Sequence, residues 1–203
     1  MSNANLLTRM GLFINREFLP RDMCKDICLQ MSSSDLLRAE VRRTEPNKED
    51  QLDIGKRSAY LTSVPPATVD LVEARISNLR PILEEFFSLE LRECEPPQFL
   101  VYKAGDFYAP HLDRRNEQGL GEDDDRRVSI VLFLNTHSED VDDGTYSGGL
   151  LTFYGLINNP NLKKFGFPLS GEEGLLAAFR SNIIHEVTPI TRGGRYTAVT
   201  WFL

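Results

Sequence analysis

Four polar residues in the second half of the chain have the types and spacing of a metal site beside an anion site. His111 and Asp113 are separated by one residue, His185 stands in a separate apolar segment, and Arg195 follows it by ten positions. Two imidazoles and one carboxylate can bind one metal ion and leave other coordination positions open. A guanidinium binds a carboxylate through two parallel hydrogen bonds. We therefore predict one mononuclear metal site with an anionic cosubstrate held beside it by Arg195.

Strand geometry decides whether these residues can meet. Side chains two positions apart on a strand point to the same face, so His111 and Asp113 can converge on one ion. We expect His185 to come from a second strand across a barrel, and a turn over 191–194 to bring the strand of Arg195 beside it. Alternation then predicts a common face for Arg195, Thr197, Val199 and Trp201. A site with two histidines, one carboxylate and open positions is typical of non-heme Fe(II) chemistry.

The elements that must carry these residues are short strands. After Pro96 and Pro97 the sequence changes to runs rich in Val, Ile, Thr and aromatic residues, separated by turns. We expect strands at 99–102, 127–134, 149–154, 175–179, 183–187 and 195–203. This succession predicts a mainly β fold, a sandwich or jelly roll, with helices packed on one sheet. We expect a single domain over 1–203, with 1–95 as N-terminal support and 96–203 as the core.

The first half of the chain predicts that support. We expect a short strand within 11–19, a helix over 21–31 that follows Pro20, and a strand at 56–61. From Val69 to Phe86 apolar residues recur every three or four positions. This spacing predicts one long amphipathic helix, kinked at Pro81 and buried against the core.

Composition excludes several classes of partner. The chain has 23 basic and 30 acidic residues, a net charge of −7 and a pI of about 5.1. Nucleic acids and anionic membranes are bound through clustered Lys and Arg, so we expect neither as a partner. Cys24, Cys28 and Cys94 are too few for a disulfide framework, and we expect them to be core residues in a reducing cytoplasm. The sequence has no apolar run of about eighteen residues and no basic-then-apolar leader, which favours a soluble protein.

A series of motifs runs through the second half. These are Tyr102-x-x-Gly105-x-x-Tyr108-x-x-His111-x-Asp113, Arg127-Val-Ser-Ile-Val-Leu-Phe-Leu-Asn135, Gly148-Gly149-x-Leu151, and His185-Glu-Val-x-Pro189 leading to Arg195-Tyr-x-x-x-x-Trp201. In this combination the sequence resembles the prolyl 4-hydroxylase group of Fe(II)/2-oxoglutarate-dependent oxygenases. The resemblance covers residues 95–203, and Arg57-Ser58 with the long helix are similar to the N-terminal part of that group.

The resemblance implies a double-stranded β-helix in which His111, Asp113 and His185 hold Fe(II). It also implies that 2-oxoglutarate and O₂ are cosubstrates and that 2-oxoglutarate is decarboxylated to succinate while an unactivated C–H bond is hydroxylated. Ascorbate is the expected accessory reductant.

The resemblance assigns the cosubstrate to three side chains. Arg195 would bind the distal carboxylate of 2-oxoglutarate, with Tyr102 and Thr197 as hydrogen-bond donors. Phe133 stands where the oxygen-sensing branch of the group has a Tyr that helps to hold the cosubstrate, which leaves the work to these three. The expected substrate contacts are Tyr108, Arg115 and Trp201.

Other polar residues have simpler explanations. His137 lies in an acidic segment and is predicted to be a surface residue, and Arg192 lies in the predicted turn, which makes it a weaker anchor than Arg195. The acidic run 122–125 predicts a solvated loop instead of a second metal site. A secondary hypothesis is that the flanking pairs Arg114-Arg115 and Arg126-Arg127 contact a substrate carboxylate when the loop closes.

The substrate stays open between two classes. One is a prolyl residue of a peptide or protein, and the other is a free amino acid or small natural-product intermediate, which a long lid over 155–174 would enclose. A non-catalytic β-helix binding module would need none of the three metal ligands, and a zinc hydrolase would gain nothing from Arg195. The sequence therefore favours an oxygenase over these two alternatives.

Overall fold

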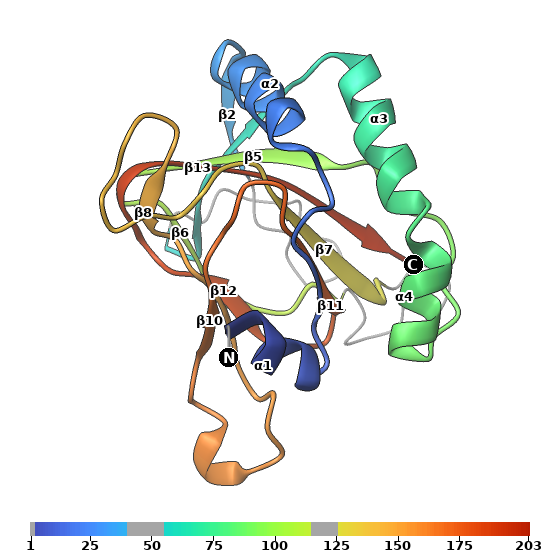
Figure 1. Cartoon of the computed structure of the whole chain (residues 1–203). Helices are drawn as coiled ribbons and strands as arrows, with labels where there is room; N and C mark the ends of the chain where they lie inside the picture. Colours follow the sequence, from blue (N-terminus) through green and yellow to red (C-terminus); the bar gives the residue numbers. More distant parts are fainter. Residues whose placement is uncertain (1–2, 40–54, 115–125) are drawn as a thin grey trace, which may run out of the picture.

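The structure is a computed structural model that describes residues 3–39, 55–114 and 126–203 (Figure 1). The elements follow one another as α1 (Asn3–Arg9), β1 (Phe13–Asn15), α2 (Arg21–Ser32), β2 (Leu36–Arg38), β3 (Arg57–Ser58), β4 (Tyr60–Thr62), α3 (Pro66–Ser77), α4 (Arg80–Phe87), β5 (Gln98–Lys103), β6 (Phe107–His111), β7 (Val128–Phe133), β8 (Tyr146–Gly148), β9 (Leu151–Phe153), η2 (Pro160–Leu162), β10 (Phe167–Leu169), β11 (Leu176–Arg180), β12 (His185–Val187) and β13 (Ile190–Phe202).

The strands form two antiparallel sheets. Within the described residues, the larger sheet has eight strands in the order β1-β11-β7-β13-β5-β4-β2, with β8 paired to β13. The smaller sheet has five, in the order β10-β9-β12-β6-β3. Apolar side chains of both sheets share one core, in which Phe133 and Phe179 of the larger sheet meet Leu151 and Phe153 of the smaller. The prediction of a mainly β jelly roll is confirmed.

Helices cover the outer face of the larger sheet. Figure 1 shows α2, α3 and α4 along that side of the molecule. Their buried residues Ile27, Val72 and Leu83 pack in one cluster with Val101 and Leu132 of the sheet. Burial of an aliphatic side chain of this size contributes about 1.5–3 kcal/mol. The helices therefore stabilise the sheet from behind and leave its inner face for the site.

Side-chain alternation along β13 separates the two faces of the larger sheet. Ala198 and Phe202 belong to the cluster under the helices, whereas Val199 packs against the inner clusters. Arg195 and Thr197 share the inner face with Val199 because residues two apart on a strand point the same way. The predicted common face of these residues is thus present.

The helix predicted from Val69 to Phe86 is two helices. α3 ends at Ser77, and α4 begins at Arg80 with Pro81 in its first turn. Pro81 has no N–H to bond the carbonyl four residues earlier, so the first helix cannot continue through it. The change of direction also buries Phe87, which is 4% exposed, in place of Phe86, which is 36% exposed.

The predicted turn over 191–194 is wrong. β13 continues through it, with a register irregularity opposite β8 between Ile190 and Arg192. Gly193 has a φ of 74°. Glycine with a positive φ occurs at irregularities within strands as well as in hairpin turns, so its presence did not require a turn. As a result, β12 and β13 belong to different sheets and are not neighbours.

Several short strands were not predicted from the sequence. β8 lies between the strands expected at 127–134 and 149–154, where no strand was predicted, and β10 lies within 155–174, where it pairs with β9. The strand expected at 56–61 is two strands, because β3 joins the smaller sheet and β4 the larger. Strands of two or three residues have no periodic pattern long enough to detect.

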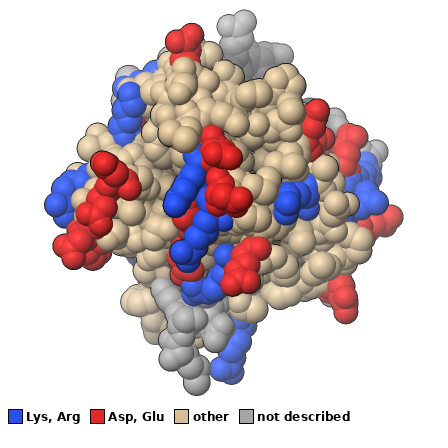
Figure 2. Space-filling view, turned by 45° about the horizontal axis from the view of Figure 1, so that its top comes forward, with Lys and Arg blue, Asp and Glu red and all other residues tan. Residues whose placement is uncertain are grey.

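Charged side chains of both signs lie on the surface. On the face drawn in Figure 2, acidic and basic side chains are intermingled among the described residues. No helix in the described part of the chain is both long and apolar enough to cross a membrane. The cysteines are free thiols in or beside the core, as predicted.

Candidate metal centre

Two neighbouring strands of the smaller sheet position the three predicted metal ligands. His111 ends β6, Asp113 lies two residues beyond it, and His185 begins β12. The two strands pair directly, with His185 opposite His111. The expectation that His185 reaches across a barrel is therefore wrong. Directly opposite residues of an antiparallel pair have Cβ atoms about 4.5–5.5 Å apart, so adjacent strands suffice.

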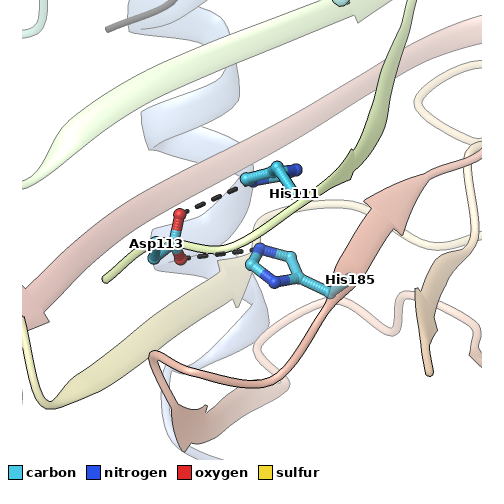
Figure 3. A group of neighbouring side chains, drawn as sticks. All are labelled: His111, Asp113 and His185. Atoms are coloured by element: carbon cyan, nitrogen blue, oxygen red, sulfur yellow. Dashed lines mark ion pairs between the residues drawn. The ribbon is translucent and has the colours of Figure 1, made fainter. Parts of the chain in front are cut away.

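The ligand atoms surround one point (Figure 3). Nε2 of His111 lies 3.5 Å from Oδ1 of Asp113, and Nε2 of His185 lies 3.5 Å from Oδ2. One ligand atom from each residue lies within 4.8 Å of the others. A separation of 3.5 Å is less than twice a typical metal–ligand bond of about 2.1 Å, so one ion can bridge the atoms.

Backbone carbonyls fix both imidazoles. Nδ1 of His111 donates to the Ala109 carbonyl at 2.8 Å, and Nδ1 of His185 donates to the Ile183 carbonyl at 3.0 Å. A carbonyl only accepts, so the proton must be on Nδ1, and the lone pair of Nε2 faces Asp113. This second contact is typical of metal-binding histidines.

Electrostatics keep the ligands in the forms that bind a cation. Burial alone would raise the pKa of Asp113, but His185, His111 and Trp201 outweigh it and hold that pKa well below its usual range. Burial lowers the pKa of His185 to about 4 despite the attraction of Asp113. At neutral pH the site thus presents a carboxylate and a neutral imidazole, the protonation states that metal binding requires.

A cavity of about 610 Å³ joins this centre to the predicted anchor. It is lined by the three ligands together with Tyr102 and Arg195. Arg195 is 1% exposed, and within the described residues its Nε and Nη2 have no hydrogen-bond partner. Nη1 lies 3.5 Å from the Thr197 hydroxyl. Buried guanidinium nitrogens without an acceptor are costly, so the cavity is suited to an anion beside Nε and Nη2.

Both predicted groups fit the residues present. Two imidazole nitrogens and one carboxylate form the donor set of Fe(II) oxygenases, which leave positions for a chelating ligand. The Nε and Nη2 atoms of Arg195, which have no hydrogen-bond partner within the described residues, can donate to the far carboxylate of a dicarboxylate in the same cavity.

Two of the three predicted substrate residues, Tyr108 and Trp201, lie beside the candidate metal ligands. The Tyr108 ring stacks on the His111 ring with centroids 3.5 Å apart. Trp201 lies close enough to Asp113 to help lower its pKa, and the Arg126 guanidinium lies 3.4 Å from the centroid of the Trp201 ring. Arg115 and the acidic run 122–125 lie outside the described residues.

Two alternatives are resolved by burial. Arg192 is exposed and donates to the Glu139 carbonyl at 2.8 Å, so it does not compete with the buried Arg195. The prediction of a surface His137 is wrong, because its side chain is only 12% exposed and meets the Tyr146 ring edge-on at 5.7 Å. Sequence could not show that β8 lies beside this segment.

Sequence reasoning missed Tyr146. Its side chain is fully buried, and Arg195 lies close enough to lower the pKa of its hydroxyl. The available signal was its position directly before the Ser147-Gly148-Gly149 segment, whose glycines belong to a motif already singled out.

Comparison with known proteins decides the family. A model of the 2OG-Fe(II) oxygenase superfamily matches residues 97–203, more than half of the chain. The chain belongs to this superfamily. Membership implies Fe(II), 2-oxoglutarate and O₂ as cofactors, as predicted, and the His111, Asp113 and His185 cluster lies within the matched part.

Relatives within the 2OG-Fe(II) oxygenase superfamily include PKHD-type hydroxylases. That of Teredinibacter turnerae is 31% identical over 122 residues, which cover 57% of this chain and 46% of that protein. That of Phenylobacterium zucineum is 29% identical over 158 residues, which cover 74% and 62%. The chain spans about half the length of the curated relatives it matches.

Solved structures of other proteins share the fold. A Pseudomonas putida prolyl-4-hydroxylase superposes with a TM-score of 0.70 and 26% identity, over 98% of this chain and 96% of that one. A Trichoplax adhaerens prolyl hydroxylase in complex with a hypoxia inducible factor peptide fragment gives 0.69 and 18%, over 98% and 86%. The predicted double-stranded β-helix is confirmed.

Proposed function

We propose that this chain is an Fe(II)- and 2-oxoglutarate-dependent dioxygenase that hydroxylates an unactivated C–H bond of a prolyl residue in a peptide or protein. One observation carries the proposal. The buried guanidinium of Arg195, whose Nε and Nη2 have no hydrogen-bond partner within the described residues, lines the same cavity as His111, Asp113 and His185. A metal-binding site alone needs no such cation. A dicarboxylate that chelates the metal needs both the metal centre at one end and the Arg195 guanidinium at the other.

Each side chain has a defined task in the proposal. His111, Asp113 and His185 hold the iron, which supplies the oxidative chemistry when bound. The Ala109 and Ile183 carbonyls keep both imidazoles oriented. Arg195 and Thr197 orient the distal carboxylate of 2-oxoglutarate, and the buried Tyr102 lies beside Arg195, with its ring centroid 5.2 Å from Cζ. The low exposure of these groups excludes water, which strengthens each electrostatic contact.

The lining of the cavity supports an uncharged ring as the reacting group. The wall carries the charged side chains Arg38, Arg57, Glu95 and Arg126, but Leu61, Leu100 and Val199 form an apolar part of it, and the aromatic rings of Tyr108 and Trp201 lie beside the candidate metal ligands. Apolar and aromatic walls with a few polar groups are typical of small-molecule recognition. The printed descriptions of the Pseudomonas and Trichoplax proteins as prolyl hydroxylases support the same substrate.

We also propose a division of labour along the chain. Residues 96–203 supply the iron and cosubstrate contacts, and residues 1–95 supply the helical support. The first part also contributes Leu37 and Arg38 to the cavity wall. The two parts act as one domain, because the core under the larger sheet contains residues from both.

The test is turnover with defined substrates. The protein is supplied with Fe(II), 2-oxoglutarate, ascorbate and O₂, together with proline-rich peptides, free proline or cell extract. We expect a peptide to gain one oxygen atom at proline, with an equal amount of succinate, and the Asp113→Ala variant to form neither product. Hydroxylation of free proline alone would replace the peptide by the small-molecule alternative. Absence of succinate under every condition would overturn the oxygenase function.

A further inference from the structure

Three buried hydrogen-bond donors lie together without an acceptor. Within the described residues, the Tyr146 hydroxyl and the Nε and Nη2 atoms of Arg195 have no hydrogen bond of normal geometry. Tyr146 is fully buried, and Arg195 is 1% exposed. Buried polar groups almost always have a partner, and each one that lacks it costs free energy. Donors of this kind, gathered in one place, indicate a site for a ligand rich in acceptors.

Glycines show how closely the two side chains approach. A methyl group at Gly149 would lie 3.1 Å from Cδ of Arg195 and 3.2 Å from Cε2 of Tyr146, so both side chains border the same point. A methyl group at Gly171 would collide with the Tyr146 hydroxyl and with the Phe133 ring. The hydroxyl therefore lies near the Phe133 ring, whose centroid is 5.0 Å from Cζ of Arg195. Phe133 itself offers no donor there.

The backbone holds Tyr146 in this position. β8 pairs with β13 and places Tyr146 opposite Gly193, two residues before Arg195. The Tyr146 N–H donates to the Thr136 carbonyl at 3.2 Å, and its carbonyl accepts from the Ser138 N–H at 2.8 Å. Burial raises the pKa of Tyr146, although Arg195 and the Gly171 backbone, both close to the hydroxyl, act in the opposite direction. The phenol is thus fixed and protonated, as a donor must be.

We propose that the Tyr146 hydroxyl donates a hydrogen bond to the distal carboxylate of the cosubstrate, beside Arg195. The inference rests on the proposed function. A carboxylate has about four lone-pair sites, enough to accept from both unpaired nitrogens of Arg195 and from the phenol. Tyr146 is therefore a specificity-determining residue, which favours a 2-oxo acid with a second carboxylate over one with an apolar end.

The test compares two ligands with and without the hydroxyl. The Tyr146→Phe variant keeps the ring and removes only the donor. The Fe(II) protein is titrated without oxygen, and the visible charge-transfer band of the chelate reports binding. One ligand is 2-oxoglutarate, and the other is 2-oxopentanoate, in which a methyl group replaces the distal carboxylate. We expect Tyr146→Phe to raise the Kd of 2-oxoglutarate by about tenfold to hundredfold and to leave that of 2-oxopentanoate unchanged.

A matched control and a second measurement separate binding from structure. Tyr196→Phe makes the same chemical change next to Arg195, but its ring packs on the helix-covered face, so both Kd values should stay at wild-type level. Without cosubstrate, Tyr146→Phe should unfold at the same temperature as the wild type or slightly higher, because an unsatisfied buried hydroxyl is removed. The added stability from 2-oxoglutarate should become smaller.

The possible results are distinct. An unchanged Kd of 2-oxoglutarate in Tyr146→Phe would overturn the inference, and so would equal weakening of both ligands. A wild-type protein that binds neither 2-oxo acid would overturn the proposed function and this inference together.

Discussion

His185 lies opposite His111 on the neighbouring antiparallel strand, and each imidazole turns its Nε2 toward a different oxygen of Asp113. The hydrogen bonds between β6 and β12 therefore set the separation of two ligands, while the chain beyond β6 brings the third. Because the scaffold is a paired sheet, the centre is formed before any ion binds.

Metal binding should stabilise the folded protein through Asp113. A ligand that binds only the folded state at about 100 times its Kd adds about 2.7 kcal/mol, which raises the unfolding temperature of a domain of this size by about 5–10 °C. We expect Mn(II), which resists oxidation, to produce this shift in the wild type and none in Asp113→Ala. Asp140→Ala, an exposed carboxylate on a loop, is the matched control. Equal stabilisation of Asp113→Ala and the wild type by Mn(II) would refute the ligand assignment.

Arg195→Met should weaken the binding of the cosubstrate without lowering the stability of the folded protein. Loss of one partner of a buried charge pair costs about 2–5 kcal/mol, so the KM for 2-oxoglutarate should rise at least about thirtyfold. Without cosubstrate the variant should be as stable as the wild type or more so, because an unpaired buried charge is removed. Arg192→Met, on the same strand but exposed, should change neither quantity. Steady-state kinetics and thermal unfolding measure both, and a wild-type KM in Arg195→Met would contradict the anchor.

Gly149→Ala should disturb the anchor indirectly. The new methyl group would overlap Cδ1 of Ile190 and press on Arg195, and the φ of 60° is unfavourable for alanine. We expect a loss of about 1–3 kcal/mol in the free energy of unfolding and a higher KM for 2-oxoglutarate. Gly155→Ala is the control, since its φ is 70° but nothing lies within 4 Å. Gly155→Ala should lose only the stability that a positive φ costs alanine, and its KM should not change. Equal KM values in the two variants would argue against contact between the methyl group of Gly149→Ala and Arg195.

The thiols should be unreactive in the folded protein. Burial raises the pKa of Cys24 and of Cys28 to about 12 and that of Cys94 to about 11, from an ordinary value of 9. Folded thiols therefore stay protonated while unfolded ones ionise, so their contribution to stability is complete below pH 9 and is lost as pH rises toward 12. At pH 8 a thiol reagent should react slowly with the native protein and rapidly after denaturation. Rapid labelling of the native protein would contradict this burial.

The site was more predictable from sequence than the arrangement of its strands. His111, Asp113, His185 and Arg195 could be found because their chemistry depends on residue type and short spacing. The pairing of β6 with β12, and the separation of β12 from β13, depend on contacts between distant segments that no local pattern encodes. Tyr146 was missed for the same reason, since its role comes from a strand of three residues beside β13.

The helices were also only partly predictable from the sequence. Apolar periodicity predicted the buried face of the segment from Val69 to Phe86, and Val72, Ile76 and Leu83 are indeed buried. The break before Pro81 and the burial of Phe87 follow from how α4 docks on the sheet. Local propensity is a weak guide where tertiary packing decides.

The most direct test of the account is the spectrum of the Fe(II) protein without oxygen as 2-oxoglutarate is added. We predict a weak visible charge-transfer band that saturates at one cosubstrate per chain and is absent from His185→Ala. A wild-type protein that binds Fe(II) but develops no band with 2-oxoglutarate would contradict the shared metal and cosubstrate site.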